Sequence, residues 1–213
     1  MAITTYTELR TAVANWLARD DLSDRIPEFI ALAEAKFNRE LRHPRMEKRS
    51  YTSVHTDTNE PEFITLPSNF QTMRRIRLSG VTGKPGLEYV TATQAETLRY
   101  GLANVTAQPA YYTIIDDEIE LIPTPGQEYE LEMVYRANIP ALASNSTNWL
   151  LTLAPDAYLY GALLEAAPYM KDDGRISVWA LGFSNAIDSL NRLGAEVSFA
   201  SGPSAVVLEN PAP

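Results

Sequence analysis

The stretch PDAYLYGALLEAAPYM, residues 155–170, decides how the chain folds. Pro155 suits the first turn of a helix, and Asp156 faces the positive end of that helix. Between residues 157 and 170 there is one charged side chain, that of Glu165. The stretch is shorter than the ~20 apolar residues that span a bilayer. A helix that is apolar nearly all round must be covered on most sides. We therefore expect it at the centre of a bundle, with neighbouring subunits covering what the chain leaves open.

Helical patterns lie on both sides of this stretch. The sequence TYTE, residues 5–8, forms a capping box at the start of a helix. The apolar spacing predicts three further helices, over residues 5–19, 26–41 and 173–193. Gly194 is typical of the position just after a helix, so the last helix is expected to end there.

The middle of the chain alternates apolar and polar residues, which is typical of strands. A second capping box, Thr91 with Gln94, predicts one short helix among them. The last three strand patterns, residues 110–115, 118–122 and 128–136, are expected to form an antiparallel meander with a turn at Asp116-Asp117.

We therefore expect an α+β protein with an insertion architecture. Residues 1–46 and 148–195 form an antiparallel helical bundle, and residues 47–147 form an inserted, mainly antiparallel β domain with one short helix. Residues 196–213 form an extended C-terminal arm.

Charge is unevenly placed along the 213 residues, whose net charge is −9. Residues 1–99 carry a net +1 and residues 100–213 a net −10. This asymmetry indicates different surfaces for different partners, or else two solvated faces. The chain has no cysteine, which excludes thiolate chemistry, and its two histidines, His43 and His55, are expected at the surface. No nucleophile or nucleotide-binding motif occurs, so we expect no enzyme, no cofactor and no metal.

Four stretches resemble the head-to-tail adaptor (connector) proteins of tailed bacteriophages. They are DRIPEFIALAEAKFNRELR (24–42), LPSNFQTMRRIRL (66–78), LEYVTATQ (87–94) and NWLLTLAPDAYLYGALLEAAPYMKDD (148–173). The resemblance implies a dodecameric ring below the portal protein, in the neck of the virion, after assembly in the host cytoplasm. It also implies that the ring binds a downstream tail or nozzle protein, with tail fibres as a further partner, and that DNA only passes through its channel. No membrane partner is implied.

A basic stretch follows the second predicted helix. Its cations are Lys36, Arg39, Arg42, Arg45, Lys48 and Arg49, and Arg74, Arg75 and Arg77 can add to them. Three interpretations stay open: a contact with another subunit or the portal, a solvated face, or a contact with DNA phosphates.

An acidic cluster is expected on the last strands. Alternation places Glu118 and Glu120 on one face, beside Glu128, Glu130 and Glu132 of the next strand. These five are either a solvated face or a negative wall of the channel, where like charge keeps DNA from sticking.

The C-terminal arm combines three prolines with apolar residues. The apolar residues are Val197, Phe199, Val206, Val207 and Leu208. We expect this arm to dock on another chain, most readily the portal; the other interpretation is a floppy terminus.

A second function from a different class also stays open. A monomeric module could bind carbohydrate through the aromatic residues of its strands, namely Tyr111, Tyr112, Tyr129 and Tyr135.

Overall fold

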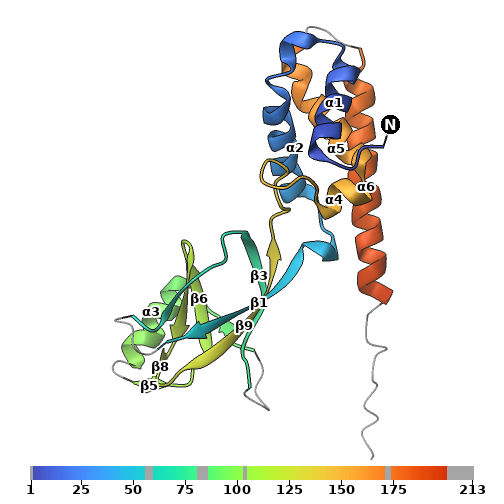
Figure 1. The fold of residues 1–213 in the computed structure, drawn as a ribbon. Coiled ribbons are helices and arrows are strands. Elements are labelled where there is room, and N and C mark those ends of the chain that lie inside the picture. Colours follow the sequence, from blue (N-terminus) through green and yellow to red (C-terminus); the bar gives the residue numbers. More distant parts are fainter. Residues whose placement is uncertain (1, 56–59, 81–85, 103–104, 171–173, 201–213) are drawn as a thin grey trace, which may run out of the picture. The chain divides into compact units, whose positions relative to one another are not determined.

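A computed structural model describes residues 2–55, 60–80, 86–102, 105–170 and 174–200. Within these residues the protein is α+β, with six α-helices and sheets of antiparallel and mixed pairing (Figure 1). The chain divides into two compact units. Residues 1–46 and 139–213 form the helical unit, and residues 47–138 form the β unit. The stretch 139–147, expected in the β domain, thus belongs to the helical unit.

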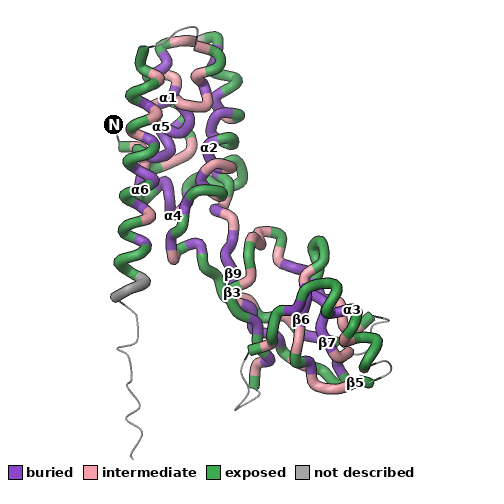
Figure 2. The backbone as a smooth tube through the Cα atoms, turned by 180° about the vertical axis from the view of Figure 1, so that it is seen from behind, coloured by how far each residue is buried: buried purple, intermediate pink, exposed green. Residues whose placement is uncertain are grey.

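The helical unit is built around α5 (Pro155–Ala166), which contacts α1 (Tyr6–Leu17), α2 (Ile26–Glu40), α4 (Trp149–Leu153) and α6 (Ile176–Ala200). Seven of its twelve residues are buried (Figure 2), and Tyr158 and Leu163 are completely inaccessible. The chain itself therefore covers most of α5, and the covering of the remainder by neighbouring subunits stays a prediction. The apolar spacing does not predict α4, because this helix has only five residues.

The helix starts follow local chemistry. Thr5 and Glu8 form the predicted capping box of α1, and Pro155 occupies the first turn of α5. A short 3₁₀ helix, η3 (Ala167–Tyr169), follows α5, and another, η1 (Asp20–Leu22), follows α1.

Helix α6 contradicts the predicted end at Gly194. It continues to Ala200, so Val197 and Phe199 belong to a helix and not to an extended arm. Gly194 is buried, and a Cβ atom there would lie 2.9 Å from the Arg42 carbonyl oxygen and 3.1 Å from the His43 Cα atom. The glycine therefore permits a close approach between α6 and the chain after α2. The rest of the predicted arm, residues 201–213, lies outside the described residues.

Side chains of the helical unit bind the backbone of the two segments that connect it to the β unit. On the outgoing side, Asn191 of α6 accepts a hydrogen bond from the Arg42 N–H at 2.6 Å. On the returning side, the Ile139 N–H donates to the Asn38 Oδ1 at 2.9 Å, and the Leu142 N–H donates to the Glu34 Oε1 at 2.8 Å. We call these three contacts the chain anchors.

The β unit contains three sheets. Sheet A has the order β1 (Glu47–Val54), β9 (Tyr129–Ala137), β3 (Phe70–Leu78) and is antiparallel. The other strands are short and form two mixed or parallel sheets. Sheet B has the order β2 (Phe63–Thr65), β7 (Glu118–Ile122), β6 (Tyr111–Ile115), β4 (Glu88–Tyr89), and a two-stranded sheet pairs β5 (Thr106–Ala107) with β8 (Thr124–Pro125). A 3₁₀ turn, η2 (Pro44–Met46), leads into β1.

Sheets A and B share one core. Leu131, Met133 and Tyr135 of β9 pack in the same cluster as Ile119 and Leu121 of β7. Helix α3 (Ala92–Gly101), with its predicted capping box, packs against β6 and β7. Because β9 alternates, its residues Glu130, Glu132 and Val134 point to the opposite, outer face of sheet A. The predicted meander is therefore half right: β6 and β7 form the hairpin, but β9 lies between β1 and β3.

Candidate assembly surfaces

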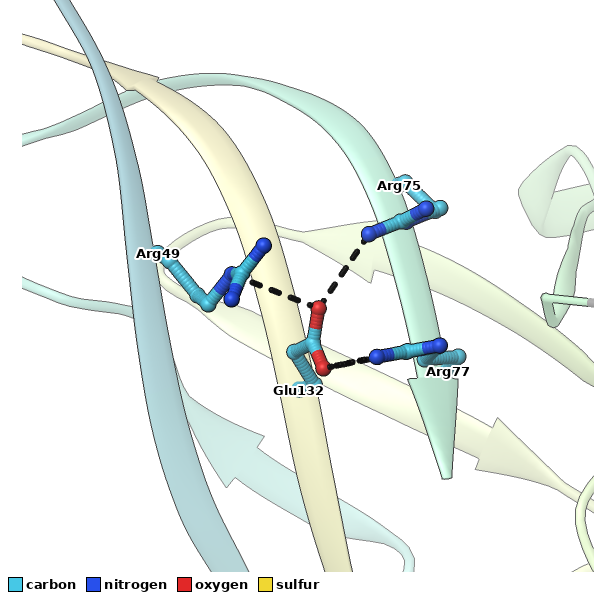
Figure 3. Close-up of polar contacts among 4 residues, drawn as sticks. All are labelled: Arg49, Arg75, Arg77 and Glu132. Carbon is cyan, nitrogen blue, oxygen red and sulfur yellow. Dashed lines mark hydrogen bonds and ion pairs between the residues drawn. The ribbon is translucent and has the colours of Figure 1, made fainter. Parts of the chain in front are cut away.

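The outer face of sheet A carries a cluster of three arginines around one carboxylate (Figure 3). Glu132 lies on the central strand β9, and its register partners are Tyr51 on β1 and Arg77 on β3. In the next row, Val134 lies between Arg49 and Arg75. The register alone thus brings three cations from both neighbouring strands to one side chain.

The contacts in this cluster are direct. The Arg77 Nε atom donates to Glu132 Oε2 at 3.0 Å, and its Nη2 atom donates to the same oxygen. The Arg75 Nη2 atom donates to Oε1 at 3.2 Å, and the Arg49 Nε atom lies 3.5 Å from Oε1. The arginines cover the carboxylate so well that only 2% of its side chain is exposed, while their own side chains stay about half exposed. The hydrogen bond from Arg77 and the positive charges of all three arginines lower the pKa of Glu132, although burial acts in the other direction.

The basic stretch is divided between the two units. Lys36, Arg39, Arg42 and Arg45 belong to the helical unit, whereas Lys48 and Arg49 lie on β1 of the β unit. Lys36 is engaged inside the helical unit, because its Nζ lies 3.0 Å from Glu165 Oε1 and 5.2 Å from the centre of the Phe183 ring. The cations Arg39, Arg42, Arg45 and Lys48 are exposed.

The five acidic candidates do not share a face, so that expectation is wrong. Their strands, β7 and β9, belong to different sheets. Glu118, Glu128 and Glu130 are exposed, whereas Glu120 and Glu132 are buried. Alternation was assigned correctly within each strand, but the pairing of β9 with β1 and β3 depends on residues more than fifty positions away in sequence, and periodicity does not show it.

Glu120 lines a hollow of about 300 Å³ in the β unit. Its Oε1 lies 2.9 Å from the Arg99 Nε atom, and Glu62 lines the same hollow. Burial is the main cause that raises the pKa of Glu120, and the charge of Glu62 adds to it, while Arg99 acts in the other direction. Glu120 is thus the buried partner of an ion pair with Arg99 and does not belong to an open acidic face.

The predicted surface position of His43 is also wrong. His43 is buried, its ring centre lies 5.3 Å from that of Trp149, and its Nδ1 atom accepts a hydrogen bond from the Arg45 N–H at 3.2 Å. Burial lowers the pKa of its imidazole. His55 is exposed, with Nδ1 3.8 Å from Glu128 Oε1. Among the residues that the structure describes, no group of three or more His, Asp or Glu side chains could hold a metal ion.

The tyrosines of the strands do not form an open aromatic platform. Tyr112 and Tyr135 are buried, and Tyr111 and Tyr129 pack partly buried against the cores of the β unit. Stacking on a sugar needs an open ring face, so the carbohydrate-binding alternative loses its basis.

The arm candidates are distributed differently from the expectation. Val197 is exposed on the last turns of α6, and Phe199 lies in the same helix. Val206, Val207 and Leu208 lie outside the described residues. None of the helices in the described part of the chain is long and apolar enough to cross a membrane.

Comparison with known proteins gives the family. No curated protein matches the chain. A family model with the description SU10 adaptor protein matches residues 4–206, which is nearly the whole chain and includes both units. The chain therefore belongs to the SU10 adaptor protein family, a family of phage adaptors.

Proposed function

We propose that this chain is the structural head-to-tail adaptor of a tailed phage, forming a dodecameric ring that joins the portal to the next tail component and surrounds the DNA channel. The observation that carries the proposal is the family match over residues 4–206. A structural role also agrees with where the chain places its polar groups. Its buried carboxylates bind backbone amides, a tyrosine or arginines of the same chain.

The proposal has a direct test. Purified chain is mixed with particles of the portal protein from the same phage genome, and the product is imaged by electron cryomicroscopy. We expect a ring of twelve copies on one end of the portal. Bare portal particles beside folded, soluble chain would contradict the proposal, whether or not the chain is a monomer by itself.

We propose that residues 201–213 dock on the portal. The segment carries Val206, Val207 and Leu208 next to three prolines, a composition that suits strand addition or a groove and does not suit a helix. A chain that ends at Ala200 keeps all of α6 and should fold normally but fail to bind portal particles.

A matched control separates the length of the segment from its apolar side chains. The full-length chain with Val206, Val207 and Leu208 replaced by serine should fail in the same way. Full binding by both variants would exclude the segment, and Arg42 and Arg45 would then be the next candidates for the portal contact.

We propose a channel-facing position for Glu128 and Glu130 only. Glu130 lies on the outer face of sheet A, Glu128 directly precedes β9, and both side chains are exposed. Glu118 belongs to sheet B and is not part of this proposal. Replacing both by lysine should leave assembly intact and slow genome exit, because a ring of positive charge holds phosphates. Unchanged exit kinetics at low and high salt would contradict the assignment.

A further inference from the structure

The arginine cluster has more positive charge than its own chain uses. One carboxylate, Glu132, faces three guanidinium groups, those of Arg49, Arg75 and Arg77. These four side chains together therefore have a net charge of +2, and the like charges repel one another over a short distance. Glu132 engages one or two nitrogens of each arginine, so each fork keeps donors for another acceptor. The cluster can therefore bind a second anionic group.

The surroundings of the cluster resemble an interface. Tyr51 lies in the same register row as Glu132, and 50% of it is exposed. Arginine and tyrosine are enriched at protein–protein interfaces, where charged side chains surround an apolar contact. We call Tyr51 and the three arginines the arginine face.

The same unit carries a surface of opposite charge. The turn between β6 and β7 presents Asp116, Asp117 and Glu118, all exposed. No lysine or arginine among the described residues forms an ion pair with these three carboxylates. Ile115, directly before them, is 46% exposed. We call residues 115–118 the acidic turn.

The two surfaces are complementary in both charge and apolar content. Each has one large exposed apolar side chain, Tyr51 or Ile115, beside charges of one sign. They belong to different sheets and share no residue, so one copy can use both at the same time. A contact between two different surfaces of identical chains is heterologous, and its repetition gives a ring when the rotation between neighbouring copies closes, as the proposed adaptor ring requires.

Nucleic acid fits the arginine face less well than a second copy does. The chain has a net charge of −9, which repels a phosphate backbone at long range. A local surplus of two charges matches the three carboxylates of the acidic turn, whereas a duplex presents a continuous row of phosphates.

We infer that, in the ring, the arginine face of one copy binds the acidic turn of the next copy. The inference rests on the proposed ring adaptor and names the contact that closes the ring.

Charge reversal on each side tests this inference. The first variant combines Arg49→Glu with Arg75→Glu and keeps Arg77, so that Glu132 retains its closest partner. The second combines Asp117→Lys with Glu118→Lys. We expect each variant alone to lose at least tenfold in ring formation on portal particles, and an equimolar mixture to regain it, because the two variants then alternate around the ring.

Matched control variants reverse the same number of charges at positions outside both surfaces. Arg10→Glu with Arg192→Glu and Glu88→Lys with Glu96→Lys alter exposed side chains outside both surfaces and should assemble normally. Circular dichroism of every variant confirms folding before assembly is scored.

A cross-link supplies a second measurement that does not need the portal. The chain has no cysteine, so Tyr51→Cys with Ile115→Cys adds the only two thiols. A short bismaleimide should then give a ladder of covalent multimers from rings or from concentrated chain, while either single variant should stop at dimers.

The outcomes distinguish the inference from the proposed function. Rings from either charge variant alone, no recovery in the mixture, or rings without a covalent ladder would overturn the inference and leave the adaptor function standing. A ladder from concentrated chain that does not bind portal would support the contact and overturn the adaptor function. If the first variant assembles normally but loses binding to a labelled 20-base-pair duplex, the arginine face is a nucleic-acid site instead.

Discussion

Each of the two units buries a carboxylate, Glu34 on α2 of the helical unit and Glu132 on the central strand β9 of the β unit, and the two units stabilise it by opposite means. In the helical unit, Glu34 accepts hydrogen bonds from neutral donors, the Leu142 N–H at 2.8 Å and the Tyr158 hydroxyl at 3.2 Å. In the β unit, Glu132 is surrounded by three arginines. Burial raises the pKa of Glu34, whereas the arginines lower that of Glu132. A buried glutamate thus forms only internal hydrogen bonds in the helical unit, whereas in the β unit it gathers arginines whose excess positive charge stays on the surface.

The largest effect is expected from a cavity in the core of the helical unit. Leu163 is fully buried on α5, so Leu163→Ala should lower the free energy of unfolding by about 2–5 kcal/mol. All three tryptophans, Trp16, Trp149 and Trp179, belong to the helical unit, and their fluorescence follows its unfolding in urea.

The matched control for this variant is Leu181→Ala. Leu181 is 63% exposed on α6, and its truncation should change stability by less than about 0.5 kcal/mol. Equal effects of the two variants would mean that α5 is not the centre of the unit.

A second test concerns the contact between α6 and the chain after α2. Gly194→Ala places a methyl group within 3.1 Å of backbone atoms of Arg42 and His43. Backbone cannot move as cheaply as a side chain, so the variant should lose about 1–3 kcal/mol despite its better helix propensity.

Gly101→Ala is the control, because a Cβ atom at Gly101 meets nothing within 4 Å. Urea unfolding of both variants should separate them. A gain in stability at Gly194 would contradict the close approach.

A third test removes the hydrogen bonds that Glu34 accepts. Glu34→Ala leaves a buried N–H at Leu142 and a buried hydroxyl at Tyr158 without this acceptor, which should cost about 1–3 kcal/mol. Glu34→Gln keeps an acceptor oxygen and should lose less. Hydrogen exchange at the Leu142 amide should be fastest in Glu34→Ala, slower in Glu34→Gln and slowest in wild type. This order would show that the Glu34 carboxylate stabilises this chain anchor.

The smallest expected effect is on the pH dependence of stability. The pKa of Glu34 is raised in the folded state, so folding favours its protonated form, and wild type should lose stability relative to Glu34→Gln as pH rises above the ordinary value of 4.5. The pKa of Glu132 is lowered, so its contribution is present above 4.5 and is lost as pH falls below that value.

Urea unfolding between pH 3 and pH 7 checks both signs, with tryptophan fluorescence for the helical unit and far-ultraviolet circular dichroism for the whole chain. The pH dependence of stability is compared between wild type and Glu34→Gln, and between wild type and Glu132→Gln. Differences of the same sign in the two comparisons would contradict opposite pKa shifts of the two carboxylates.

Local chemistry was predictable from the sequence. Both capping boxes, Thr5 with Glu8 and Thr91 with Gln94, form as predicted, because all their atoms lie within four residues. The turn at Asp116-Asp117 forms for the same reason, and Asp116 adopts the left-handed conformation that aspartate tolerates (φ 55°).

Features set by distant residues were not predictable in this way. Gly194 is typical of a helix end by propensity, but α6 continues past it, and the missing side chain allows a close contact with residues 42–44 instead. Glu132 was expected on an acidic face, since the period of β9 does not say which strands lie beside it. The arginine face is the consequence of a register, in which Arg77 is paired with Glu132 across 55 positions.

The chain anchors have a mechanical consequence. The polypeptide crosses between the units twice, at residues 46–47 and 138–139, and each crossing is tied down within a few residues by a side chain of α2 or α6. Tension applied to the β unit is therefore delivered to two helices that both pack on α5. We expect the three hydrogen bonds of the chain anchors to bear this load before it reaches the apolar core of the helical unit.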